Sequence, residues 1–184
     1  MNKDRLDLFR SLFIGREDVH AIGTDTGIKA VRSPLADKVL AAHLDGAYRV
    51  GSYPIFNQHW TLRLVFDVDR HDYEGRALVR IIVRRLRRLG VSPYIERSRN
   101  KGFHICVLFN KPLRAARARQ FAEIVLRGLD CPIEVFPKQI TVEEGKFGNA
   151  ISFRSSAMIS ITATPCSSST TSDRFPISGP SSER

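Results

Sequence analysis

Apolar residues in the first third of the chain are spaced for two helices and one strand. Helical spacing runs through residues 4–13, and Ser33-Pro34 has the form of an N-cap and first-turn proline opening a second helix. The stretch 15–32 between them is polar and irregular, so we expect no regular element there. Alternation over residues 48–56 predicts a strand. We therefore expect an N-terminal helical extension ahead of the main domain.

From Trp60 onward, strand-like and helix-like patterns alternate. The apolar run 60–66 predicts a buried strand, and a single apolar stripe over 76–89 predicts an amphipathic helix. The other predicted elements are strands at 91–97 and 103–109, a helix from Pro112 through Arg127, and strands at 132–136 and 148–153. The order β-α-β-β-α-β is the split βαβ arrangement, so we predict an α+β fold that is ferredoxin-like or RRM-like.

The hydrophobic pattern stops after Phe153. Residues 154–184 are rich in Ser and Thr, contain three prolines and show almost no apolar periodicity. Such a segment cannot bury enough apolar surface to offset the entropy of ordering it. We expect one folded core over 1–153 followed by a disordered tail over 154–184, and the sequence has no internal repeat.

Charge narrows the class of partner. The 184-residue chain carries 29 Lys and Arg against 19 Asp and Glu, a formal net charge of +10. This excess favours a polyanionic partner, with nucleic acid ahead of a membrane surface. The N-terminus lacks the apolar segment of a secretory signal, and no apolar run is long enough to span a bilayer. We expect a cytoplasmic protein with no membrane partner.

The cysteines exclude two kinds of scaffold. Cys106, Cys131 and Cys166 are single and far apart, so no Cys-x-x-Cys pair is present to hold zinc. Their odd number also argues against a disulfide framework. We predict that Cys106 is a buried strand residue, and any metal chemistry must then depend on carboxylates.

The helix predicted over 76–89 has one strongly basic side. Six arginines occur between Gly75 and Ile95 with no acidic residue to balance them. Charged helix faces are most often simply solvated, which is the ordinary interpretation here. The missing acids favour a ridge that contacts a nucleic-acid backbone, formed by Arg80, Arg84, Arg87 and Arg88.

Two aspartates end the strand predicted over 60–66. Alternation along a strand sends Asp67 and Asp69 to the same side and Val68 to the other, so both carboxylates can face one cation site. Hard oxygen ligands suit Mg²⁺ or Mn²⁺. The alternative is a strand-end turn, where Asp is common.

A second polar motif, Ser98-x-x-Lys101-Gly102-x-His104, precedes the strand at 103–109. Gly102 allows close approach of backbone to an anion, and the three side chains can donate hydrogen bonds to phosphate oxygens. Alone, this motif also fits a β-turn followed by a structural histidine. Its combination with the acid pair, across one intervening helix, favours a site for a metal-bound nucleotide.

These motifs resemble the archaeo-eukaryotic primase superfamily, the primase-polymerases, whose palm has an Asp-x-Asp or Asp-x-Glu strand followed by a Ser-x-His-type motif. The resemblance covers about residues 6–153 and is greatest to the primase domains of prokaryotic conflict systems and of CRISPR-linked primase-polymerases. Further segments that carry it are Leu8-Phe9-Arg10-Ser11-Leu12-Phe13-x-Gly15-Arg16-Glu17-Asp18-Val19, Gly51-x-Tyr53-Pro54, Glu96-Arg97-Ser98-Arg99, Phe136-Pro137-Lys138-Gln139 and Gly148-Asn149-x-Ile151.

The resemblance implies template-directed synthesis of DNA or RNA from nucleoside triphosphates, with Mg²⁺ or Mn²⁺ as cofactor and a single-stranded template as partner. A helicase or nuclease partner is also implied, because many relatives are fused to such modules. In this view Asp67 and Asp69 hold the cations and Glu134 is the third acidic ligand. Without the family, Glu134 is equally well an alternating strand residue that faces solvent.

The resemblance also assigns the nucleotide contacts. His104, with Ser98, Lys101 and Gly102, is implied to bind the incoming triphosphate. Lys138 and Gln139 are implied to support the phosphates or the template, with Asn149 in a turn near the nucleotide that could equally be a flexible loop. The resemblance does not require Arg97 and Arg99, which are plausible nucleic-acid contacts; arginines beside a strand need no such role. The predicted nucleotide contacts are therefore Ser98, Lys101, Gly102, His104, Lys138, Gln139 and Asn149, and the predicted nucleic-acid contacts, which come from the charge pattern, are Arg80, Arg84, Arg87, Arg88, Arg97 and Arg99.

One departure and two rival functions stay open at this point. Relatives usually continue with ordered sequence beyond the Gly-Asn-x-Ile strand, which suggests a truncated or frame-shifted homologue of lower stability. A metal-dependent nuclease could use Asp67, Asp69 and Glu96, because two-metal cleavage needs the same kind of carboxylates. A catalytically inactive single-strand binder is the second rival, and it would bind nucleic acid without the acid pair.

Overall fold

The structure is a computed structural model that describes residues 3–13, 15–25, 27–47, 49–70, 72–97 and 102–153, except for the side chains of residues 5, 12 and 13. The predicted tail at 154–184 and the predicted ligands Ser98, Arg99 and Lys101 lie outside these ranges. Within them, no helix combines the length and apolar character needed to cross a lipid bilayer.

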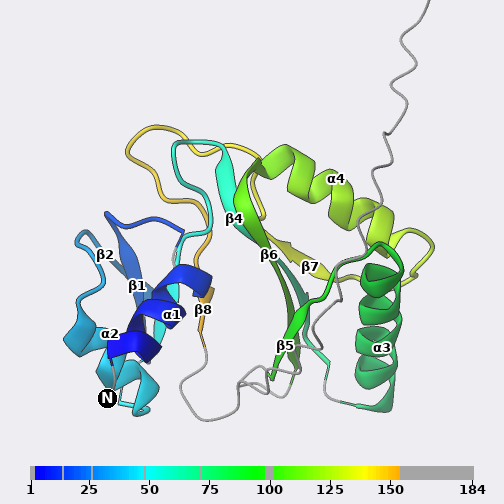
Figure 1. The fold of residues 1–184 in the computed structure, drawn as a ribbon, viewed down its shortest axis with the longest axis horizontal. Coiled ribbons are helices and arrows are strands. Elements are labelled where there is room, and N and C mark those ends of the chain that lie inside the picture. The colour runs from blue at the N-terminus through cyan, green and yellow to red at the C-terminus, as the bar shows by residue number, and fades with distance from the viewer. Residues whose placement is uncertain are drawn as a thin grey trace, which may run out of the picture.

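The described chain forms two antiparallel four-stranded sheets and four helices (Figure 1), which confirms the predicted mixture of α and β elements. The longer sheet, called here the long sheet, has the strand order β5-β6-β4-β7. Its strands are β4 (Trp60–Val68), β5 (Tyr94–Arg97), β6 (Phe103–Arg114) and β7 (Glu134–Phe136), and its helices are α3 (Tyr73–Arg88) and α4 (Ala115–Leu126). Along the chain these elements run β4, α3, β5, β6, α4, β7.

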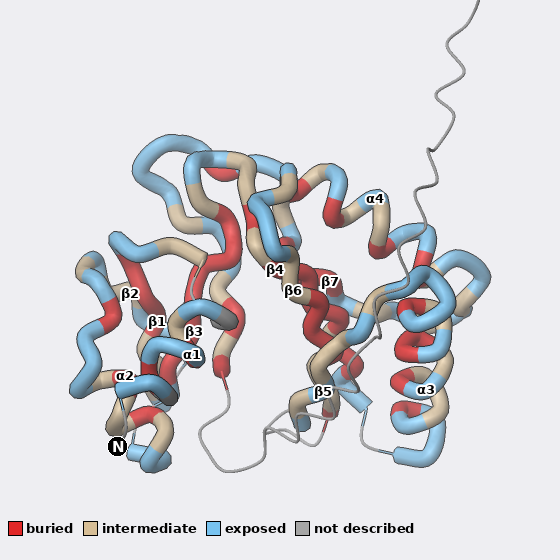
Figure 2. Tube along the Cα trace, viewed as in Figure 1, coloured by how far each residue is buried: buried red, intermediate tan, exposed pale blue. Residues whose placement is uncertain are grey.

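One face of the long sheet holds the main hydrophobic core. Leu64, Phe66 and Val68 alternate along β4 and pack against the two helices, with Ile82 and Leu86 of α3 fully buried. The side chain of Asp72 caps α3 by accepting a hydrogen bond from the Gly75 amide at 2.8 Å. Figure 2 shows the buried residues of α3 and α4 turned toward the sheet and the exposed residues turned outward.

The other strands form a second sheet, called here the small sheet, in the order β2-β1-β3-β8. Its elements are β1 (His20–Thr24), β2 (Gly27–Val31), β3 (Val50–Ser52) and β8 (Ile151–Ser152), accompanied by α1 (Lys3–Phe13) and α2 (Asp37–Leu44). It contacts the long sheet on the face away from α3 and α4, where Ile151 packs against Val65, Cys106 and Phe136. Cys106 is buried, as predicted.

Two predictions for the small sheet were wrong. The stretch 15–32, expected to be irregular, contains the β1–β2 hairpin; β2 is largely exposed, so it lacks the apolar alternation that marks a strand in a sequence. The strand predicted at 148–153 shortens to β8 and pairs with β3 of the small sheet. The N-terminal region is therefore a helix-and-sheet layer and more than a helical extension.

Two predicted helix starts were also wrong. The second helix begins at Asp37 with Ala36 as its N-cap, after the expected start at Ser33-Pro34. The fourth begins at Ala115, because Pro112 lies within β6. The β4–β6 register shifts between Thr61 and Arg63, and such an irregularity can accommodate a residue that has no amide hydrogen to donate.

Phe153 connects the last described residues to both layers. Its ring packs edge-on against Phe9 of α1, with ring centroids 5.3 Å apart, and against His43 of α2 at 6.2 Å. The guanidinium of Arg63 lies 5.2 Å from the centroid of the same ring. Arg63 is itself buried on β4 and donates a hydrogen bond to the Ser52 hydroxyl of β3, and burial lowers its pKa to about 10. Phe153 and Arg63 thus join the small sheet to the long sheet.

We expect Phe153→Ala to lower the free energy of unfolding by about 3–5 kcal/mol, because it removes a buried ring and leaves a cavity between the layers. Chemical denaturation followed by circular dichroism measures this change. Leu8→Ala is the matched control on α1, where Leu8 is 50% exposed, and should change stability by less than about 0.5 kcal/mol. Equal effects of both substitutions would contradict the linking role of Phe153.

Candidate functional site

A row of polar residues crosses the long sheet on the face away from α3 and α4. The antiparallel register places Glu96 of β5 opposite His104 of β6, His104 opposite Asp67 of β4, and Asp67 opposite Glu134 of β7. Directly opposed residues of neighbouring strands have side chains on the same face. We call these four residues the acid row. Three of them were predicted site residues from distant parts of the sequence.

His104 lies between two carboxylates. Its Nε2 is 3.5 Å from Oδ1 of Asp67, and its Nδ1 is 3.5 Å from Oε2 of Glu96. Burial of the ring opposes its positive charge, but the hydrogen bond to Glu96 and the charges of Asp67 and Glu96 outweigh burial, so the pKa of His104 is raised. The carboxylates on both sides of His104 therefore favour the protonated form of its ring.

The contact between Glu96 and His104 was not predicted from the sequence. The sequence suggested Glu96 only as a metal ligand of a nuclease. A signal was present, because residues 96 and 104 flank the same connection between two strands that form a hairpin. Pairing of Arg97 with Phe103 at the end of that hairpin puts Glu96 and His104 opposite each other.

Asp67 lies in a strongly acidic setting. Burial raises its pKa, and the charges of Asp69 and Glu134 add to that effect, while His104 and Lys138 oppose it. The carboxylates of Asp69 and Glu134 therefore lie near enough to Asp67 to repel its charge. A set of oxygen ligands that repel one another is the donor chemistry that suits a hard divalent cation.

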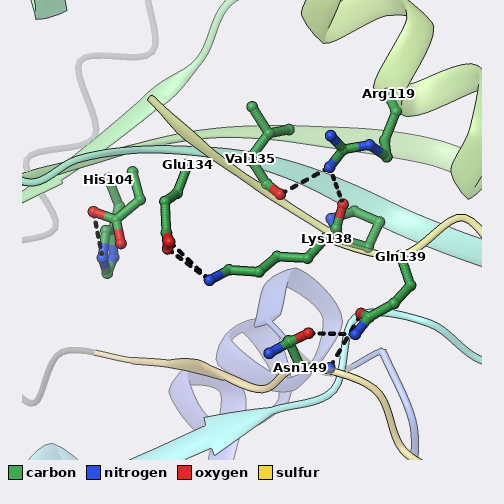
Figure 3. Close-up of polar contacts among 9 residues, drawn as sticks. His104, Arg119, Glu134, Val135, Lys138, Gln139 and Asn149 are labelled. Atoms are coloured by element: carbon green, nitrogen blue, oxygen red, sulfur yellow. Dashed lines mark hydrogen bonds and ion pairs between the residues drawn. The ribbon is translucent and has the colours of Figure 1, made fainter. Parts of the chain in front are cut away.

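Glu134 is directed toward Lys138 (Figure 3). The Nζ of Lys138 lies 2.9 Å from Oε1 and 2.8 Å from Oε2 of Glu134, and 5.1 Å from the centroid of the Phe136 ring. Over the described ranges, no three His, Cys, Asp or Glu side chains converge on one point where a metal ion could bind. The donor set fits a divalent cation in its chemistry, and Glu134 would have to exchange its lysine partner to join it.

Gly102, the residue before β6, lies close to the end of β4 that carries Asp67 and Asp69. A Cβ at this position would lie 2.4 Å from the carbonyl oxygen of Val68 and 3.1 Å from Cα of Asp69. Only a glycine fits at that approach. The described end of the predicted phosphate motif therefore lies against the end of β4 that carries the aspartates.

Gln139 and Asn149 are brought together by direct hydrogen bonds, as Figure 3 shows. The Gln139 side-chain amide donates to Oδ1 of Asn149, and the backbone N–H of Asn149 donates to Oε1 of Gln139 at 3.3 Å. The adjoining Phe147 ring lies beneath two guanidinium groups, with Arg16 at 5.1 Å and Arg32 at 4.7 Å from its centroid. These contacts anchor the turn that carries Asn149 to the small sheet.

Arg119 supports the segment between Glu134 and Lys138, and sequence reasoning did not single it out. From α4, its Nη1 donates to the carbonyl oxygens of Val135 at 3.2 Å and Pro137 at 3.0 Å. No local pattern separates this arginine from the other basic residues of α4. Its role depends on the packing of α4 behind β7.

The predicted nucleic-acid contacts do not join the acid row. Arg80, Arg84, Arg87 and Arg88 are exposed on the outer side of α3 and, with Val83, line a hollow of about 500 Å³. That helix packs on the opposite face of the long sheet. Arg97 alternates with Glu96 and so faces the helix side as well.

A family model for the archaeo-eukaryotic primase domain of the TOTE conflict system matches residues 25–154, well over half of the chain. The chain belongs to this family. A search of the curated proteins finds no significant match. This match confirms the resemblance deduced from the sequence. It supports nucleotidyl transfer as the activity of the family. Archaeo-eukaryotic primase domains generally use divalent metals, in keeping with the carboxylates around Asp67.

We expect Glu96→Gln to lower the pKa of His104, because burial still opposes the imidazolium while one hydrogen-bonded carboxylate is lost. NMR titration of the imidazole measures this pKa. Glu123→Gln, on the exposed side of α4, is the control and should leave the titration unchanged.

The contact between Glu96 and His104 also predicts how the stability of the fold changes with pH. Since the folded pKa of His104 is raised from 6.5, its contribution to stability is fully present below that value and is lost as pH rises through the folded pKa. Glu96→Gln should weaken this pH dependence. An unchanged pKa and an unchanged pH profile would contradict the coupling between Glu96 and His104.

Proposed function

We propose that this primase-family domain catalyses template-directed nucleotidyl transfer, joining nucleoside triphosphates on a single-stranded nucleic-acid template. The supporting observation is the cross-strand alignment of Asp67, His104 and Glu134 on three neighbouring strands. Carboxylates that could bind a cation and a histidine that could donate to a phosphate oxygen lie side by side, and phosphoryl transfer depends on such positioning and charge stabilisation. We further infer that the long sheet is a ferredoxin-like palm, supported by its strand order and by both helices lying on one face.

The proposed cation ligands are Asp67, Asp69 and Glu134, holding Mg²⁺ or Mn²⁺. Such an ion neutralises charge on the phosphates and lowers the pKa of an attacking hydroxyl. The chain's own contribution is to place Asp69 and Glu134 where their charges act on Asp67, with Lys138 opposing that effect. Glu134 would then exchange Lys138 for the cation, which frees the ammonium group for a phosphate oxygen.

The proposed triphosphate contacts surround His104. The charged imidazole supplies a hydrogen-bond donor beside the acid pair, and Glu96 orients the ring from the side away from Asp67. Gly102 permits the backbone to approach the phosphates closely, and Ser98 and Lys101 lie within the four residues that precede it in the sequence. Lys138, Gln139 and Asn149 would contact the phosphates or the template from the opposite edge of the row. Catalysis would depend on positioning and charge stabilisation, with no side-chain nucleophile.

A nuclease that uses Asp67, Asp69 and Glu96 as ligands is less well supported by this geometry. His104 lies between Glu96 and Asp67 and interacts with both carboxylates. Glu96 is therefore occupied as the partner of a histidine. Burial raises the pKa of Cys106 to about 12, so this nearby thiol is no candidate nucleophile either.

We expect the wild-type chain to extend labelled products on single-stranded DNA with Mn²⁺ or Mg²⁺ and nucleoside triphosphates. Asp67→Asn/Asp69→Asn should reduce incorporation by at least about 100-fold, the loss expected for a well-placed electrostatic group. Gel separation of the products measures this. Glu123→Gln is the control for removal of an exposed carboxylate and should retain activity. Template binding without incorporation by the wild type would overturn the proposal in favour of an inactive binder.

The lysine partner of Glu134 provides a metal-binding test. Lys138→Met should tighten Mn²⁺ binding about twofold to fivefold, because a partly exposed ion pair of modest strength no longer competes for Glu134. Electron paramagnetic resonance of free Mn²⁺ measures the affinity. The gain should disappear in a Glu134→Gln background, and Lys111→Met serves as the control for general charge removal. A gain that persists without Glu134 would show that Glu134 is not a ligand.

A further inference from the structure

A second strongly charged surface lies on α3, away from the acid row. Tyr73, Arg76, Arg80, Arg84 and Arg87 are exposed and recur at helical spacing, so they share one side of the helix. The opposite side of α3 packs onto the long sheet. We call these five residues, together with Arg88, the α3 stripe. It extends along the outside of the molecule (Figure 1).

The charges of the α3 stripe are not compensated within the described residues. Glu74 and Asp72, the acids at the start of the helix, both form ion pairs with Arg70. No described carboxylate forms an ion pair with Arg80, Arg84, Arg87 or Arg88. Arginines four positions apart without intervening acids repel one another, which weakens a helix.

Two ordinary explanations account for only part of this arrangement. Arg85 has a structural role, because its Nη1 donates to the carbonyl oxygens of Val125 at 2.7 Å and Arg127 at 2.8 Å. Arg87 and Arg88 lie in the last turn, where the helix dipole favours positive charge. Arg80 and Arg84 lie in the middle of the helix and gain from neither effect. Their charge is best explained by an anionic partner outside the chain.

The form of the stripe favours a single nucleic-acid strand. Arginines four residues apart rise about 6 Å along the helix, so they can follow successive phosphates of an extended strand. Tyr73, which is 73% exposed, offers a ring for base stacking at the start of the stripe. A membrane would need an apolar helix face to insert, whereas the apolar face of α3 is buried against the sheet.

The stripe begins close to the acid row in the chain. β4 ends at Val68 and α3 begins at Tyr73, and the turn is tight, since a Cβ on Gly75 would lie 2.3 Å from the carbonyl oxygen of Arg70. A strand leaving the acid row near Asp69 can therefore pass around the end of β4 onto Tyr73.

We propose that the α3 stripe binds the phosphate backbone of single-stranded nucleic acid at a site separate from the acid row. The site lies on the other face of the long sheet, so it contacts nucleotides other than those at the acid row. Identifying that strand as the template rests on the proposed function; the binding itself does not. Such a contact would hold the template while the segment being copied lies at the carboxylates.

Fluorescence anisotropy with a labelled 20-nucleotide single strand, without nucleotide or divalent cation, tests this proposal whether or not the chain is a polymerase. Arg80→Gln/Arg84→Gln/Arg87→Gln should weaken binding at least about tenfold near 100 mM salt. It should also reduce the slope of log affinity against log salt by about 2, since each phosphate contact contributes about 0.7.

Lys29→Gln/Lys38→Gln/Lys111→Gln is the matched control, because it removes the same charge from exposed positions outside α3. It should retain nearly the wild-type affinity and slope. Arg80→Lys/Arg84→Lys/Arg87→Lys should restore most of the binding, which separates lost charge from lost folding. Equal losses in the two glutamine variants, or no loss in either, would overturn the proposal.

Two competitors test the identity of the partner. A single strand should displace the labelled oligonucleotide better than a duplex of equal length, and vesicles containing phosphatidylserine should not displace it. Preferential displacement by the duplex would overturn the single-strand assignment. Arginine-dependent binding to the vesicles without binding to the oligonucleotide would overturn the nucleic-acid assignment.

Discussion

The antiparallel register of β4 with its two neighbours is the constraint on which both the core and the candidate site depend. Each residue of β4 faces either the helices or the opposite side, so Phe66 enters the core and Asp67 enters the acid row. A slip of one position would exchange these faces, burying a carboxylate among apolar side chains and exposing a phenylalanine. The large cost of that exchange fixes His104 and Glu134 beside Asp67 as firmly as it fixes the core.

The acid row shows how the sheet tolerates several negative charges in a small area. Its carboxylates alternate with basic side chains, since His104 separates Glu96 from Asp67 and Lys138 balances Glu134. The balance is local, because Asp67 still has a raised pKa that results from burial and from its acidic neighbours. Asp67 and Glu134 have carboxylate oxygen atoms that could bind a hard divalent cation, and such an ion would offset the repulsion at Asp67.

The arginines of the α3 stripe are separated from these carboxylates by the thickness of the sheet and its helix layer. The α3 stripe carries exposed arginines on the outer surface, while the acid row occupies the inner face with the small sheet nearby. Placing the two charge types on opposite faces prevents the arginines from neutralising the cation ligands.

The sequence by itself determined the family, the amphipathic helix α3 and the strand that ends in the acid pair, because these depend on local periodicity and on motifs of a few residues. It did not reveal the β1–β2 hairpin, whose exposed strand has no apolar alternation, nor the pairing of β8 with the small sheet. It predicted a basic ridge on α3 and an acid pair on β4, but not that they lie on opposite faces of the long sheet. Only the tertiary structure decided which distant residues face each other, because strand pairing and helix packing depend on contacts between segments that no local pattern encodes.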